Sequence, residues 1–214
     1  MANLIEKFKS IENRIIMFGK LSTFKHLFYF LFYICVSYIF ESWFLIAIAI
    51  YSLCICIVKA NCIRGLSKNQ DQTKDCKSYI RGGIILTSSS MFYLIFTVYQ
   101  TFYPSSFQFS FVVALAIALY AAYNILVSVW GLIRSKGRTL LVKEYKLTNF
   151  ALAFNNMLIA QIAISSFIAS SNSAFYNIFL GIICGTITLI IGMYLIIDGA
   201  FKKYKIKNRF KNRF

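Results

Sequence analysis

Apolar residues in this chain gather into six long blocks separated by short polar stretches. Each block is about 17 to 25 residues long, which is the length a helix needs to cross the hydrocarbon core of a bilayer. Only 14% of the residues are charged, whereas about a quarter are charged in a typical soluble domain. A single proline leaves these helices largely uninterrupted. The sequence therefore predicts an all-α integral membrane bundle of six transmembrane helices.

The limits of the apolar blocks place the expected spans at about 24–40, 42–58, 82–102, 108–133, 147–169 and 174–197. The outer connections between them are only a few residues long, so we expect three tight hairpins of consecutive helices. A mobile loop of mixed charge is expected over residues 59–81, and a shorter inner link over 134–146.

A second kind of pattern precedes the first span. Apolar residues recur there at spacings of three and four, with charged residues on the other faces: Leu4, Phe8, Ile11, Ile15 and Phe18. This pattern predicts an N-terminal amphipathic interfacial helix over residues 1–23, lying on the inner leaflet. Packing of this helix against another protein face is the alternative.

The net charge of +16 is distributed in four basic clusters. The clusters precede the first span and follow the second, fourth and sixth spans, and the other connections contain no Lys or Arg. Because cytoplasmic loops attract basic residues, both termini are predicted to be cytoplasmic. A nucleic-acid-binding surface would be one continuous basic face, so no nucleic-acid partner is expected.

The basic tail over residues 200–214 ends in a repeated Lys-Asn-Arg-Phe. Each basic residue near an anionic leaflet contributes about 1 kcal/mol of attraction. We therefore predict contact with a lipid bilayer that has an anionic inner leaflet, and a specific lipid site is a sharper alternative. The candidate lipid contacts are Lys202, Lys203, Lys205, Lys207, Arg209, Lys211 and Arg213.

The fifth span, which contains "NFALAFNNMLIAQIAISSF", is rich in amides for a membrane helix. Hydrocarbon cannot satisfy the donors and acceptors of these side chains. The candidate intramembrane polar contacts are Asn124 in the fourth span and Asn149, Asn155, Asn156 and Gln161 in the fifth. On a helical projection the fifth-span amides point to different faces, which favours hydrogen bonds to neighbouring helices. The alternative is a conduit lined by Asn124, Asn156 and Gln161.

Small residues form narrow stripes on two spans. In the sixth span, Gly181, Gly185, Thr188 and Gly192 lie on one face, a pattern that lets helix backbones approach closely. A similar stripe of small and hydroxyl-bearing residues begins at Gly83 in the third span. We predict that these stripes are helix contacts, either within the chain or between protomers.

Residues that catalyse reactions or bind metals are scarce. The chain has one histidine, His26, so no multi-histidine metal site can form, and the cysteine spacing fits no usual zinc pattern. His26 and Asp198 are expected at the inner ends of spans and Glu41 at an outer end. No ionisable side chain is then expected near a bilayer midplane, where such residues usually mark ion or proton pathways. We therefore predict a non-enzymatic protein with no catalytic residue, no metal and no cofactor, and no proton-coupled transport through a buried carboxylate.

Four segments combine glycines, aromatics and amides in apolar helices: "YIRGGIILTSSSMFYLIF", "ALAIALYAAYNILVSVWGLIR", "LAFNNMLIAQIAI" and "GIICGTITLIIGMYLI". Over residues 79–199 the chain resembles an uncharacterised family of small multi-pass membrane proteins of Gram-positive bacteria. The resemblance implies a location in the bacterial plasma membrane and carries no activity.

The packing stripes and the scarcity of catalytic residues favour a component of a larger membrane system. The leading hypothesis is a scaffold or a regulatory or accessory subunit, whose contact is a membrane-protein partner or a second copy of the chain. The alternative is a small-solute permease or channel without buried ionisable residues.

Overall fold

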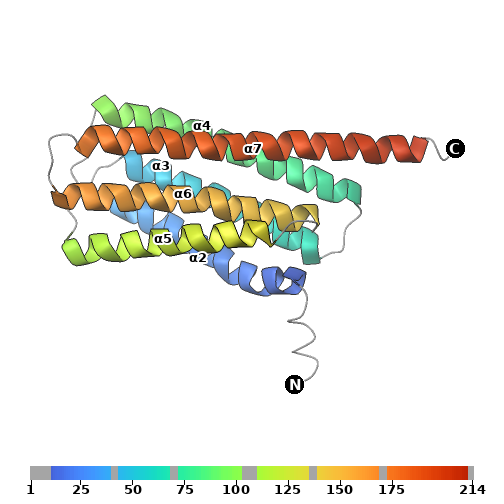
Figure 1. Ribbon diagram of the computed structural model, residues 1–214, viewed down its shortest axis with the longest axis horizontal. Helices are drawn as coiled ribbons and strands as arrows, with labels where there is room; N and C mark the ends of the chain where they lie inside the picture. The colour runs from blue at the N-terminus through green and yellow to red at the C-terminus, as the bar shows by residue number, and fades with distance from the viewer. Residues whose placement is uncertain are drawn as a thin grey trace, which may run out of the picture.

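The computed structural model describes residues 11–39, 43–67, 72–102, 110–134, 139–168 and 173–211 (Figure 1). Nearly every residue in those ranges is helical, and none of them is in a strand. The helices are α2 (Ile11–Ile39), α3 (Trp43–Ser67), α4 (Gln72–Phe102), α5 (Phe111–Ile133), α6 (Leu140–Ile168) and α7 (Ser173–Lys211). The predicted all-α bundle is confirmed.

Each of these helices is long and apolar enough to cross a membrane. The candidate spans are Ile15–Ile39, Leu45–Ser67, Gln72–Tyr99, Phe111–Ile133, Leu140–Ser165 and Phe175–Asn208. Large apolar side chains such as Phe28, Leu119 and Ile190 are exposed on the outside of the bundle, which suits contact with lipid rather than water. These are the features of a multi-pass membrane protein.

The beginning of α2 and the end of α7 lie at the same end of the bundle (Figure 1). The first turns of α2, α4 and α6 and the last turns of α3, α5 and α7 lie there. We call it the basic end, because Lys and Arg residues are concentrated near it. Basic residues of the described chain such as Lys20, Lys77, Arg134 and Lys203 belong to this half of their helices. Helix order thus brings the described members of the four sequence clusters towards one end of the bundle.

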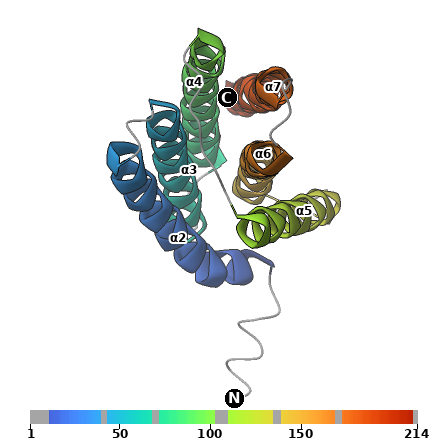
Figure 2. The ribbon, with the colours of Figure 1, turned by 90° about the vertical axis from the view of Figure 1, so that its left-hand side faces the viewer.

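The helices pair differently from the three expected hairpins. The most extensive packing is between α4 and α7, followed by α2 with α3 and α5 with α6. Figure 2 shows α4 and α5 on different sides of the bundle, with α6 between them, and these two helices share no comparable interface. The expected hairpin of the third and fourth spans is therefore wrong, whereas the first two spans pack together and so do the last two.

The loop expected over residues 59–81 is also wrong, because most of it is helical. α3 continues to Ser67 and α4 already begins at Gln72. Polarity suggested a loop, but Cys62 and Tyr79 in these added turns are buried in the bundle. Tertiary packing therefore extends both helices past the apolar blocks.

The inner link expected over 134–146 contains "TLLVKEYK", a stretch typical of an early turn of the fifth-span helix, and α6 does begin at Leu140, with Val142 buried. The tail over 200–214 likewise continues the sixth span, because α7 is helical to Lys211. Figure 1 shows α7 reaching well beyond its neighbours at the basic end.

α2 is one unbroken helix, so no helix boundary separates an interfacial segment from the first span at residue 23. Ile15 and Gly19 are buried and lie against α3 and α6. These first turns therefore pack on the bundle, which was the alternative to a surface helix. Leu4 and Phe8 lie outside the described residues.

Candidate functional site

The amide of Gln161 begins a chain of two hydrogen bonds, of which the second joins α6 to α7. Its Nε2 donates a hydrogen bond to Ser165 Oγ (3.1 Å), and that hydroxyl donates to Asn177 Oδ1 of α7 (3.0 Å). Interhelical hydrogen bonds of this kind contribute about 0.6 kcal/mol each in membrane proteins. The geometry favours a packing role for Gln161 over a place on the wall of a conduit.

The other predicted amides lie on several sides of α5 and α6. Asn155 is buried, whereas Asn149 and Asn156 are partly exposed. The main-chain oxygen of Asn149 accepts a hydrogen bond from Ser128 Oγ of α5 (3.2 Å). The Asn124 side chain donates to a carbonyl of its own helix (2.8 Å). These contacts do not bring the amides into one polar stripe.

The glycine stripe of α7 faces the stripe of small residues on α4, so the contact is within the chain. At each glycine an added Cβ atom would lie within 2.5 Å of an α4 side chain. The pairs are Gly181 with Thr97, Gly185 with Leu94, and Gly192 with Thr87. Thr188 is buried in the same stripe. Close backbone approach explains why α4 and α7 form the most extensive interface.

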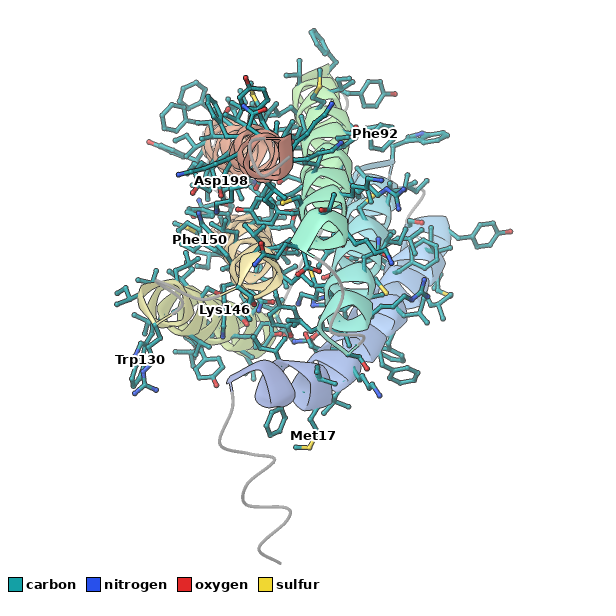
Figure 3. The ribbon with its side chains drawn as sticks, turned by 90° about the vertical axis from the view of Figure 1, so that its right-hand side faces the viewer. Met17, Phe92, Trp130, Lys146, Phe150 and Asp198 are labelled. Atoms are coloured by element: carbon teal, nitrogen blue, oxygen red, sulfur yellow. The ribbon has the colours of Figure 1, made fainter. Side chains whose placement is uncertain are left out.

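Three side chains contact the Asp198 carboxylate near the basic end, where α7 meets its neighbours (Figure 3). Its Oδ2 pairs with Lys202 one turn away (2.9 Å) and with Lys143 of α6 (3.1 Å), and it accepts a hydrogen bond from Tyr79 of α4 (3.1 Å). The i,i+4 pair of Asp198 and Lys202 is the helix pair that the spacing suggests. Lys202, one of the candidate lipid contacts, is therefore also part of an ion-pair group.

The remaining candidate lipid contacts lie on the projecting end of α7. Lys203, Lys205 and Lys207 are exposed. Arg209 and Lys211 belong to the last helical turns, and their side chains are not described. Arg213 lies outside the described residues.

Lys59 is buried inside the bundle, which the sequence did not predict. Its side chain is 1% exposed. Its Nζ lies 2.8 Å from His26 Nε2 and donates to Ser22 Oγ (3.1 Å), both on α2. The ring of Tyr145 on α6 lies 5.6 Å from the same nitrogen. The Lys59 nitrogen is therefore surrounded by an imidazole, a hydroxyl and an aromatic ring. Two ion pairs are found among the described residues, and neither includes Lys59.

His26 is buried inside the bundle as well, which the sequence did not predict. It is 1% exposed, and its Nδ1 has no hydrogen-bond partner among the described residues. It lies well inside the candidate span Ile15–Ile39. The structure thus buries a basic pair, His26 and Lys59, between α2, α3 and α6.

Glu144 is the third ionisable side chain that the sequence did not place in the interior. It is 0% exposed, and neither carboxyl oxygen has a hydrogen-bond partner among the nitrogen and oxygen atoms of the described residues. The Cys62 thiol of α3 lies beside the carboxyl group. A Cβ atom added at Gly82 of α4 would lie 1.8 Å from Oε1. Glu144 therefore occupies the space that a glycine leaves free.

These buried groups form one connected region. The Cys62 thiol interacts with both Glu144 and Lys59, and Lys59 contacts His26. We call Glu144, Cys62, Lys59 and His26 the ionisable cluster. It joins α6, α3 and α2 and lies close to the basic end, where its polar groups are surrounded by apolar core residues.

Helical spacing offered a signal for this cluster. Ser22 and His26 are four residues apart, and Lys59 and Cys62 three apart, so each pair shares a helix face. Glu144 follows an apolar run within "LLVKEYKL". What the spacing could not reveal is which faces meet, because that depends on how α2, α3 and α6 pack.

The cysteines and carboxylates do not gather into a metal-binding group within the described part of the chain. The six cysteines are free. Comparisons with protein-family models, with curated proteins and with solved structures find no match to this chain.

Proposed function

We propose that this protein is a small-solute permease or channel of the bacterial plasma membrane, with both termini cytoplasmic and an ionic solute. The observation that carries the proposal is the ionisable cluster. Isolated charges in a bundle core cost several kcal/mol each, and buried pairs contribute little to stability. Ionisable side chains within membrane spans are therefore usually retained for function, most often on ion or proton pathways.

The permease or channel was the alternative hypothesis from the sequence, and it is now preferred to the accessory subunit. The accessory-subunit hypothesis rested partly on an expected lack of ionisable residues inside the bundle. Lys59, His26 and Glu144 are inside it, so the alternative, a permease or channel, gains support in a form that includes buried ionisable groups. Among the amides, Gln161 favours helix packing, because it donates to Ser165, whose hydroxyl bonds to Asn177 of α7.

Osmotic swelling of proteoliposomes tests the proposal. Vesicles that contain the purified protein are shrunk in a hyperosmotic solute, and light scattering follows their reswelling as the solute enters. A panel of small ionic and neutral solutes identifies the class. We expect faster reswelling than in empty vesicles for at least one ionic solute, and loss of the increment in Lys59→Met and Glu144→Gln.

The matched control is Lys203→Met, which removes an exposed lysine outside the cluster and should leave reswelling unchanged. Equal rates in protein-containing and empty vesicles across the panel would reject the permease.

An accessory subunit is the second candidate, and the projecting end of α7 favours it. Phe201 and Tyr204 are exposed there, on turns that extend past the other helices (Figure 1). Aromatic side chains outside the bundle are typical protein contacts. Native mass spectrometry of the protein extracted gently from its own membrane tests this candidate. A stoichiometric second protein that is lost in the double variant Phe201→Ser, Tyr204→Ser would support it, and a chain without any protein partner would not.

A further inference from the structure

Glu144 has the surroundings of a carboxyl group that binds a proton. It is fully buried where α6 meets α3 and α4, and both of its oxygens lack a nitrogen or oxygen partner among the described residues. Gly82 leaves the space that one of these oxygens fills. The absence of a side chain at this one position of α4 is what admits the carboxyl group.

The groups that face Glu144 do not neutralise a negative charge. The Cys62 thiol faces it from α3, and Asp75 and Tyr79 face it from α4. Lys143, its neighbour on α6, is paired with Asp198 of α7. Lys59 is not in ion-pair contact with Glu144. An unpaired carboxylate in a core costs several kcal/mol, so the neutral acid is the stable form.

A second carboxyl group lies near Glu144 on the side of the basic end. Asp75 lies in the first turn of α4 and is partly exposed, and it is the carboxylate that acts on Glu144. The Cys62 thiol beside Glu144 also interacts with Lys59, which contacts His26. Glu144 thus has a carboxylate near the bundle end as one neighbour and is connected to the basic pair through Cys62.

We propose that Glu144 binds and releases a proton, exchanging it with water at the basic end, and that the proton is the transported or coupled ion. In the release step the carboxyl O–H bond breaks, and the proton passes to a water molecule, which leaves Glu144 as a carboxylate. The identity of the ion rests on the proposed transport function, whereas the protonation of Glu144 does not.

Infrared difference spectroscopy tests the protonation directly. Purified wild type in detergent at neutral pH should show the C=O stretching band of a protonated carboxylic acid, and the band should shift in D₂O. Glu144→Gln should lack it. Glu144→Asp keeps a carboxyl group and should show the band at a shifted frequency. Asp198→Asn is the matched control, because that carboxylate is ionised by its two lysines and should leave the band intact.

A spectrum in which wild type and Glu144→Gln are identical would overturn the proposal, and Glu144→Asp guards against a variant that loses its fold. Proton uptake into vesicles that contain a trapped pH dye supplies the second readout. If the band depends on Glu144 but no proton uptake is measured, the proton is not the transported or coupled ion, while the protonation of Glu144 is still supported. If Glu144→Gln has the same solute flux as wild type, Glu144 has no role in transport, while the proposed permease function is still supported.

Discussion

Replacing Gly192 by alanine should separate α7 from α4. The new Cβ atom would lie 2.4 Å from Thr87 Oγ1, 2.8 Å from the main-chain nitrogen of Thr87 and 3.1 Å from the main-chain oxygen of Gly83. Comfortable contacts of a carbon atom begin at about 3.5 Å. Rotation of the Thr87 side chain can relieve the first contact, but the two main-chain contacts can be relieved only if the helices move apart.

The expected loss of stability follows from two opposing terms. Overpacking of a tight contact costs about 1–3 kcal/mol, and main-chain contacts favour the upper part of that range. Alanine recovers about 1 kcal/mol of helix propensity relative to glycine. Gly192→Ala should therefore lower the free energy of unfolding by about 1–2 kcal/mol.

Gly131→Ala on α5 is the matched control. Its new Cβ atom would meet the flexible end of the Lys146 side chain at 3.2 Å, which can move away. Figure 3 shows Lys146 between α6 and α5. We expect this variant to be as stable as wild type or up to about 1 kcal/mol more stable.

Titration of the protein in dodecylmaltoside micelles with sodium dodecyl sulfate, followed by circular dichroism, measures both variants. The reasoning about the α4–α7 contact is refuted if Gly192→Ala unfolds at the same detergent fraction as Gly131→Ala.

Four further predictions concern other contacts. Gln161→Leu should cost about 0.6 kcal/mol, and it should be non-additive with Asn177→Leu in a double-mutant cycle, because both belong to one chain of hydrogen bonds; additive losses would contradict this. Gly82→Ala should cost about 1–3 kcal/mol by displacing Glu144, and the double variant with Glu144→Ala should be no less stable than Glu144→Ala alone; a further loss in the double variant would place the clash elsewhere. Asp198→Asn should cost about 0.5–1 kcal/mol at low salt and less at high salt, since the paired lysines are partly exposed; an effect independent of salt would argue against the ion pairs. A cysteine at position 203, in a background whose native cysteines are replaced, should react with a membrane-impermeant maleimide in inverted vesicles and not in intact cells; the reverse result would invert the proposed orientation.

The sequence was sufficient for the helices and for some of their contacts. Apolar block length and the alternation of basic clusters depend on the chain alone, and they predict six helices with both ends on one side. The glycine stripe of α7 was visible for the same reason, since small residues four apart must share a helix face. That the stripe meets α4 inside the chain depends on tertiary packing, which periodicity does not encode.

The ionisable cluster was missed for a physical reason. Lys59 and Glu144 lie at the edges of apolar blocks, where charged residues ordinarily reach water or headgroups. They are buried here because α3, α4 and α6 extend past those blocks and pack on one another and on the first turns of α2. A charged residue at the edge of an apolar block can therefore either reach water and headgroups or be buried, depending on how the neighbouring helices pack.

The length of α7 means that a small tilt of this helix moves its end by a larger distance. Gly199 is the last buried residue among those of α7 whose side-chain burial is described, and it lies against Tyr79 and Ile80 of α4. The following 12 residues to Lys211 form a helical arm of about 18 Å. If α7 pivots at Gly199, a tilt of about 10° moves the tip by about 3 Å. Asp198 lies next to this pivot and is tied to Lys143, the residue before Glu144. A small displacement in the interior, such as one that accompanies proton release, would thus be amplified into a larger movement of positive charge outside the bundle.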